Sequence, residues 1–374
     1  MKSAVARLFA IGISYTTAIL SSAFTSGSCG CAVSGSEKKI TKYFGILNCF
    51  TTFAKLEPAK PLNNAQIGGS FFYYTYMKAS CTKPYSSPEQ IVQILKSRGM
   101  LMEDEHKVES YLLNIGYHRL SAYIFPFYKS PKSDLILKKG TTFEQVLTLY
   151  RFDKKLRILL FNEIEKIEVA IRSVLANIGC QELGDRYWIT KPEYFANEDK
   201  FNQTLAVIEK ELASSKEDYI ENFRRNYVEN YPPAWMITEV LSFGNLNYIY
   251  SNIASNQLLK RIAGYFGLKP KVFTSWMTVL ANLRNMCCHH VRIWNRDFML
   301  NPAEPRKTSN AWIDTTNIDK KRIFYRLCII RYFLASVSNN NFNEKIANLL
   351  DRFPSIDIAA MGFCKGWKNE HLWL

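Results

Sequence analysis

An arginine lies inside the apolar face of a predicted helix. Residues 271–290 carry apolar side chains at steps of three and four, which predicts one amphipathic helix that begins after Pro270. At about 100° per residue, Arg284 falls within the apolar stripe, between Leu280 and Cys287. A cation in that position is costly unless it has a partner, so we expect Arg284 to be paired or to face a polar group.

The composition is that of a folded, basic protein. Of 374 residues, 47% are hydrophobic and 14% are aromatic, which supports a sizeable core and excludes a disordered chain. The net charge of +15 favours polyanions such as RNA, DNA or an anionic membrane face, and the alternative is an ordinary basic protein. The nine cysteines are irregularly spaced, which argues against a disulfide framework and favours a reducing cytosol.

The first 76 residues differ in character from the rest. Basic residues precede a short apolar run that ends at Leu20, as in a signal-like leader, and the run is too short to span a bilayer comfortably. We expect residues 1–76 to be an unstructured, misassigned upstream segment, with Met77 as the true start of a cytoplasmic protein. A genuine signal peptide in residues 1–23 would instead export the chain as an envelope protein.

From Met77 onward, apolar residues repeat at helical spacing and strand signals are sparse, which predicts an all-α fold. We expect a small N-terminal helical subdomain at residues 77–140. A larger helical domain is expected at residues 141–353, followed by a C-terminal tail at residues 354–374.

Local signals place the individual helices. Ser87 and Thr142 each open a capping box, and the glycines at 99, 116 and 179 are placed to end helices. Besides 271–290 and the helix between Ser87 and Gly99, helices are predicted at about 103–115, 151–178, 200–226, 234–253, 256–266, 318–337 and 342–352.

The end of the Arg284 helix carries the pattern R-N-x-x-x-H, formed by Arg284, Asn285 and His289. A histidine can take the proton from a ribose 2′-hydroxyl or protonate the leaving 5′-oxygen, and an arginine can hold the phosphate. Asn285 lies one turn before His289 and can orient it. The five-residue spacing separates Arg284 from His289 by about 140°, so a second copy could complete the site. An isolated match of this kind usually has no function.

Two further clusters are candidates for RNA contact. Tyr117, His118 and Arg119 could stack bases and hold phosphate, or they could form a hydrogen-bonded corner between helices. Arg292 and Arg296 flank the end of the Arg284 helix, where phosphate contact and solvated surface are equally compatible with the sequence.

Other charged and metal-type residues surround the pattern. Glu168 and Arg172, four residues apart, form either a surface pair or a partner network for the helix at 271–290. Cys287, Cys288 and the two histidines after them suggest a metal, but adjacent helical residues point in different directions and no second ligand pair lies at zinc spacing. We therefore expect no metal or cofactor and interpret both cysteines as core residues.

Several ordered motifs together resemble the Abi-like (abortive infection) family of bacterial phage-resistance proteins. The resemblance covers about residues 83–300. The motifs that carry it are Lys83-Pro84 through Leu95–Gly99, Tyr117–Ser121, Thr142-Phe143, Tyr150–Arg157, Glu168–Arg172, Pro233–Trp235, Glu239–Gly244, and Leu283–Asn285 through Trp294–Arg296.

This resemblance implies a HEPN-like helical bundle and a metal-independent endoribonuclease toxin whose Arg and His motifs meet across a homodimer. Arg284 and His289 match the catalytic pair and Asn285 its polar companion, with His290, Glu168 and Arg172 in support. Cys288 stands where alanine is more usual, which removes no catalytic atom. The alternative is a non-catalytic RNA-binding module that holds a regulatory small RNA or an antitoxin.

Overall fold

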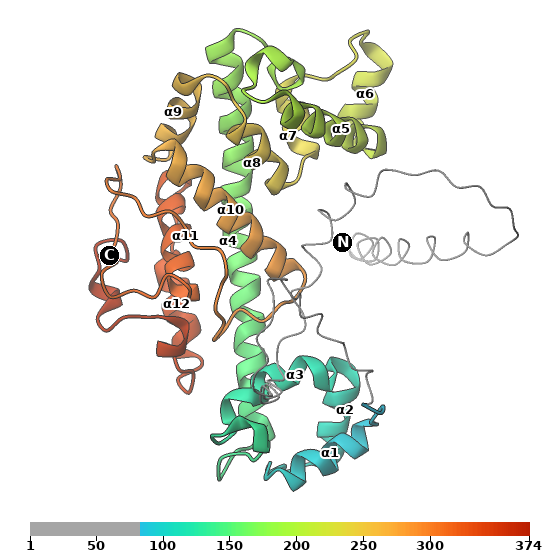
Figure 1. Cartoon of the computed structure of the whole chain (residues 1–374), viewed down its shortest axis with the longest axis vertical. Helices are drawn as coiled ribbons and strands as arrows, with labels where there is room; N and C mark the ends of the chain where they lie inside the picture. Colours follow the sequence, from blue (N-terminus) through green and yellow to red (C-terminus); the bar gives the residue numbers. More distant parts are fainter. Residues whose placement is uncertain (1–82) are drawn as a thin grey trace, which may run out of the picture. The chain divides into compact units, whose positions relative to one another are not determined.

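One long helix supports the part of the chain that the structure describes. The computed structural model describes residues 83–374, so the expectations for residues 1–76 lie outside it. Helix α4 (Phe143–Leu183) has 41 residues, and helices that precede and follow it pack along its length (Figure 1). The described residues form helices, turns and isolated bridges but no β-strand, which confirms the all-α prediction.

The other helices group around α4. Three precede it and gather near its N-terminal end: α1 (Pro88–Ser97), α2 (Glu105–Ile115) and α3 (Tyr117–Ile124) (Figure 1). Those that follow are α5 (Glu198–Ser214), α6 (Asp218–Asn226), α7 (Ala234–Val240), α8 (Phe243–Ser251), α9 (Asn256–Tyr265), α10 (Pro270–Cys288), α11 (Ile323–Val337) and α12 (Phe342–Asp351). Helix α10 contacts α4, α8, α9 and α11, which places it centrally. Within residues 83–374, no helix combines the length and apolarity needed to cross a membrane.

Both predicted capping boxes are present. The Ser87 hydroxyl accepts from the backbone of Gln90, whose side chain accepts from the Ser87 backbone, and α1 begins at the next residue. Thr142 and Gln145 make the same reciprocal pair at the start of α4. These bonds satisfy amide groups that a helix start otherwise leaves without partners.

The predicted end of the long helix at Gly179 is wrong. Helix α4 continues to Leu183 and ends at Gly184, which has a left-handed φ of 64°. Gly179 lies within the helix because it packs against the buried Trp188: a Cβ at this position would lie 2.4 Å from the Trp188 ring. The glycine therefore serves close packing and not helix termination.

Several other helix boundaries also differ from the prediction. The segment predicted as one helix at 200–226 is divided into α5 and α6, and the segment at 234–253 is divided into α7 and α8, where the Ser242 hydroxyl caps α8. Serine side chains can hydrogen-bond nearby backbone amides in place of the bonds of a continuous helix, so a new helix begins after Ser242. Residues 117–124, where no helix is predicted, form α3.

The C-terminal residues belong to the core. In the segment 354–374, expected to be a tail, Trp367 and Trp373 are buried, and both rings pack near Phe324 of α11. The carboxylate of Glu163 on α4 is fully buried and binds Lys166 at 2.8 Å and Lys345 of α12 at 2.7 Å. The division of the chain at residue 140 stays a prediction.

We predict opposite effects of alanine at two helical glycines. Gly179→Ala places a methyl group against Trp188 and should lower the free energy of unfolding by about 1–3 kcal/mol through overpacking. The control, Gly264→Ala in α9, meets no atom within 4 Å and should raise it by about 0.5–1 kcal/mol. Urea unfolding measures both, and equal effects of the two changes would contradict the packing role of Gly179.

A second prediction concerns acid. Burial raises the pKa of Glu163, but the hydrogen bonds and charges of Lys166 and Lys345 outweigh it and hold that pKa below 4.5. Glu163→Gln should therefore cost about 1.5–3 kcal/mol of unfolding free energy at pH 7. The difference from wild type should shrink as the pH falls below the ordinary glutamate pKa, because the unfolded chain then binds a proton that the native carboxylate takes up only at lower pH. Denaturant titrations at pH 7 and pH 3.5 measure this, and a difference as large at pH 3.5 as at pH 7 would exclude the mechanism.

Candidate functional site

Helix α10 presents Arg284 at the edge of the core. Pro270 occupies the first turn, and the apolar stripe that includes Trp276, Leu280 and Cys287 is buried. The Arg284 side chain retains 32% of its exposure, and its Nε lies 3.4 Å from Oε2 of Glu168 on α4. The prediction that this arginine has a partner is confirmed.

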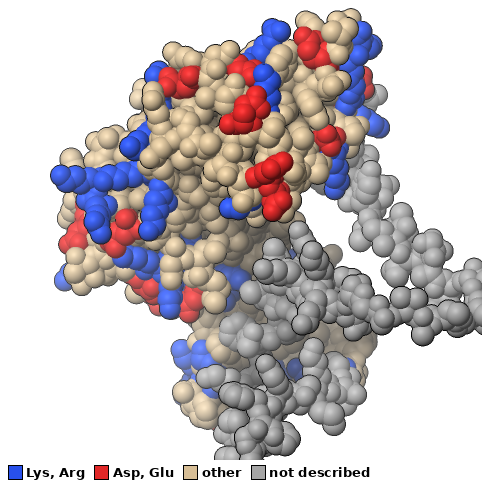
Figure 2. Space-filling model, turned by 45° about the horizontal axis from the view of Figure 1, so that its top comes forward, with Lys and Arg blue, Asp and Glu red and all other residues tan. Residues whose placement is uncertain are grey.

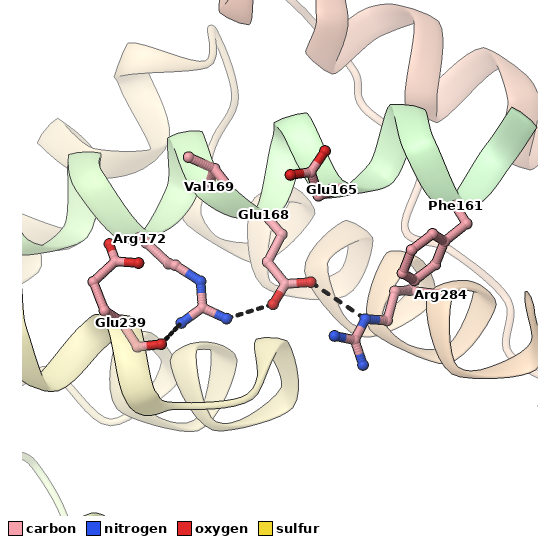
Figure 3. Close-up of a pocket in the computed structure, with 7 residues that line it drawn as sticks. All are labelled: Phe161, Glu165, Glu168, Val169, Arg172, Glu239 and Arg284. Carbon is pink, nitrogen blue, oxygen red and sulfur yellow. Dashed lines mark hydrogen bonds and ion pairs between the residues drawn. The ribbon is translucent and has the colours of Figure 1, made fainter. Parts of the chain in front are cut away.

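Glu168 and Arg172 form a buried network and not a surface pair. Arg172 donates from Nη2 to Oε1 of Glu168 at 2.5 Å. Its Nη1 donates to the backbone carbonyls of Thr238 and Glu239 at the end of α7. Figure 3 shows the Glu168 carboxylate between the two guanidinium groups. The pair therefore ties α4 to α7 and to α10 at the point where Arg284 emerges.

A pocket of about 250 Å³ opens beside this network (Figure 3). Its lining residues are Phe161, Glu165, Glu168, Val169, Arg172, Glu239 and Arg284. The Arg284 guanidinium lies 5.9 Å from the centre of the Phe161 ring. Three carboxylates and two guanidiniums share the lining, so an incoming phosphate would compete with Glu168 for Arg284.

The chain leaves α10 through a tight turn that carries both histidines. The amide of His290 donates to the Cys287 carbonyl at 3.2 Å, and the amide of Val291 donates to the Met286 carbonyl at 2.9 Å. This is the pair of bonds of a Schellman motif, and His290 holds the left-handed position (φ 57°) that glycine usually occupies. His289, the C-cap residue, and His290 are both exposed.

Helix α3 fixes this turn from the side. The Arg119 Nη1 donates to the carbonyl oxygen of His290 at 2.7 Å, across 171 residues of sequence. His118 is exposed, whereas the Tyr117 hydroxyl is half-buried and accepts from Arg98 at 3.1 Å. The structure thus brings Arg119 to the end of α10, while Tyr117 takes part in a contact between helices.

A buried aspartate that is not among the predicted site residues holds the chain after the turn. The carboxylate of Asp153 on α4 accepts from the backbone amides of Ile293 and Trp294, with a shortest distance of 2.7 Å. It also accepts from the Tyr123 hydroxyl at 2.6 Å and from Arg157. Burial raises the pKa of Asp153, and the Arg157 charge and these donors oppose that rise. Asp153 lies on the same apolar stripe as Leu156 and Leu160, so the test that singled out Arg284 would have found it.

The two arginines beyond α10 have different surroundings. Arg292 is half-buried and donates from Nη1 to the carbonyls of Trp294 and Asn295, at 2.8 and 2.7 Å. Burial lowers the pKa of Arg292 below its ordinary value. Arg296 is also half-buried. In this structure Arg292 therefore stabilises the loop that follows the histidines.

The expectation that both cysteines lie in the core is wrong for one of them. Cys287 is buried, and burial raises the pKa of its thiol to about 12, whereas Cys288 is exposed. Within residues 83–374, no three His, Cys, Asp or Glu side chains gather as metal ligands would. The side-chain oxygen of Asn285 accepts from Arg284 at 3.4 Å, so its recorded contact is with the arginine and not with His289.

The left-handed conformation of His290 gives a testable prediction. Glycine adopts this conformation without the steric cost of a Cβ, so His290→Gly should raise the free energy of unfolding by about 1 kcal/mol. His289→Gly is the matched control, because His289 has an ordinary φ of −85° and offers no such gain. Denaturant unfolding compares the two, and a loss of stability in His290→Gly would show that the imidazole makes a stabilising contact.

Comparison with known proteins places this site within a family. No curated protein and no solved structure matches the chain. Residues 110–295 match the model of the family described as Abi-like protein. The match includes Arg119, Asp153, Glu168 and the whole of α10, so over these residues the chain belongs to the Abi-like family.

Proposed function

We propose that this chain is an abortive-infection protein of phage defence that cleaves RNA without a metal ion, as a cytoplasmic homodimer with a HEPN-like helical bundle. Membership in the Abi-like family supports a role in abortive infection. The observation that supports the chemistry is the arrangement at the end of α10. An exposed His289 lies on a fixed turn, five residues after a partly exposed Arg284 at the edge of a pocket.

The chemistry assigns a separate task to each side chain. The 2′-oxygen of the ribose attacks the adjacent phosphorus, and the bond from phosphorus to the 5′-oxygen breaks. His289 of one copy takes the 2′ proton, and the same residue of the second copy gives a proton to the leaving 5′-oxygen. Arg284 donates to the phosphate as negative charge develops, and Asn285 orients its guanidinium. No step requires a metal or another cofactor.

An uncovered apolar strip beside the pocket supports the dimer. Ile158, Phe161 and Val169 of α4 are exposed large hydrophobic residues, and the last two line the pocket with Arg284. Exposed apolar residues close to a polar site are typical of protein interfaces. A second copy that covers this strip would bring two α10 ends together and would exclude water from the reacting phosphate.

The remaining candidate residues would contact RNA outside the reacting bond. His118 and Arg119 are exposed on α3, and Arg119 reaches the turn that carries the histidines. We propose that they hold phosphate groups adjacent to the cleaved one, together with Tyr117, Arg292 and Arg296. Glu168, Arg172 and His290 act in support, by positioning Arg284 and by shaping the turn.

A second candidate function is a non-catalytic RNA-binding module that holds a regulatory small RNA or an antitoxin. The observation that favours it is the neutralisation of Arg284 by Glu168 within a pocket that also contains two other carboxylates. On the face drawn in Figure 2, Lys and Arg side chains form separate clusters with Asp and Glu among them. A surface of this kind can hold RNA without a cleavage site.

The experiment is RNA cleavage by the full chain in the presence of EDTA. His289→Ala should lower the cleavage rate by about 10²–10⁴-fold, because the general acid or base is lost. Arg284→Ala should lower it by about 10²–10³-fold, because a donor to the phosphate is lost. His106→Ala is the matched control, since this exposed histidine lies on α2, and its rate should equal that of wild type.

The outcomes separate the two candidates. Full cleavage by His289→Ala would falsify the catalytic assignment. RNA binding without cleavage, unchanged in the His289 and Arg284 variants, would support the binding module. The mass of the assembly, measured on the same samples, tests the dimer: a monomer that cleaves at the wild-type rate would contradict it.

A further inference from the structure

A second concave surface lies away from α10, between α1 and the loop that leads into α4. It encloses about 500 Å³, and we call it the α1 groove. Its lining residues are Ser97, Arg98, Gly99, Leu101, Lys129, Ile136, Leu137, Lys138, Lys139 and Gly140. None of these residues belongs to the Arg284 pocket, and neither proposed function uses the groove.

The α1 groove has aliphatic lining residues that are solvent-exposed. Leu101 retains 56% of its exposure and Ile136 retains 50%, while Leu137 is buried. Apolar side chains exposed in a concave surface lose unfavourable hydration when a ligand covers them. The groove therefore favours a ligand with aliphatic side chains.

The backbone around the groove is already fixed. The Leu137 amide donates to the Arg98 carbonyl, and the Leu101 amide donates to Thr141, each at 2.9 Å. The Lys129 amide donates to the Ile136 carbonyl at 2.8 Å. These bonds hold the shape of the groove before a ligand arrives, so binding loses little conformational entropy. They also occupy the amides that would pair with an added strand.

The charge of the lining has one sign. Arg98, Lys129, Lys138 and Lys139 line the groove, and no acidic residue does so among the described residues. Arg98 is engaged by two tyrosine hydroxyls, and Lys138 donates to the Pro126 carbonyl at 3.2 Å. Within residues 83–374, the ammonium groups of Lys129 and Lys139 have no recorded hydrogen bond or ion pair, so both are free to meet an anionic ligand.

The chemistry distinguishes among anionic occupants. Single-stranded RNA binds through aromatic platforms for its bases, and no aromatic ring of residues 83–374 lines the groove. Leu101 and Ile136 line a concave surface, whereas an anionic bilayer is flat or convex on this scale and would not follow it. A peptide that alternates aliphatic and acidic side chains matches both the aliphatic and the basic residues of the lining.

We propose that the α1 groove is a docking site for an acidic peptide segment of a partner protein, in which aliphatic side chains cover Leu101 and Ile136 and carboxylates meet Lys129 and Lys139. This site is independent of RNA cleavage at α10. The preformed groove gives the partner specificity, and the basic lining residues raise its association rate.

The test selects peptides of about a dozen residues from a random phage-displayed library on the full chain, followed by fluorescence anisotropy of the enriched peptides. We expect the enriched sequences to combine Asp or Glu with Leu, Ile or Val. The double variant Lys129→Glu/Lys139→Glu should weaken their binding by about tenfold or more, since two favourable charge contacts become repulsive. Ile136→Ser should also weaken it, whereas Lys365→Glu/Lys368→Glu, which alters lysines elsewhere on the chain, should leave it unchanged.

Circular dichroism and thermal unfolding of each variant show whether the fold is intact, and the Ile136→Ser result provides a second test that does not alter charge. Enriched peptides without acidic residues, or peptides whose binding ignores both groove variants, would overturn the proposal. Binding of oligouridylate or of phosphatidylglycerol vesicles that depends on Lys129 and Lys139, without selection of acidic peptides, would overturn it in favour of a nucleic acid or a membrane.

Discussion

The site depends on the hydrogen bonds that the buried carboxylate of Asp153 accepts from the chain after α10. Asp153 lies on the longest helix, accepts hydrogen bonds from two consecutive amides after α10, and is held in turn by Tyr123 and Arg157. Burying a carboxylate away from water is unfavourable unless hydrogen-bond donors and a positive charge surround it. These hydrogen bonds therefore fix the backbone at Ile293 and Trp294, and they limit the conformational freedom of the turn that carries both histidines.

Glu168 positions Arg284 as Asp153 positions the turn. Its two oxygens meet Arg172 and Arg284, so one buried carboxylate orients a guanidinium that belongs to the fold and another that reaches the pocket. The same ion pair sets a condition on the proposed chemistry. A phosphate must draw Arg284 partly away from Glu168, or a second copy of the chain must change the local field, before the arginine can act on a substrate.

The fold class, both capping boxes and the position of Arg284 within an apolar stripe could be predicted from the sequence. Each of these depends on side chains that lie close together in sequence. Gly179 was misinterpreted because its role comes from Trp188, which meets it only in the folded chain. The link from Arg119 to His290 and the contact of Glu163 with Lys345 span more than 170 residues, and no local pattern reports them. Asp153 could have been found, because a charge within an apolar stripe is visible in the sequence alone.

The length of α4 has a mechanical consequence. At 1.5 Å per residue, this helix extends for about 60 Å, and Asp153 and Glu168 lie about 22 Å apart along its axis. Asp153 and Glu168, which hold the two parts of the site, thus lie on the same helix. The helices α1–α3 lie near one end of α4, and α7 and α9 pack farther along it. Any bending of α4 would alter the separation between the Arg284 guanidinium and the His289 imidazole. The stiffness of α4 therefore helps to keep these two groups at a constant distance.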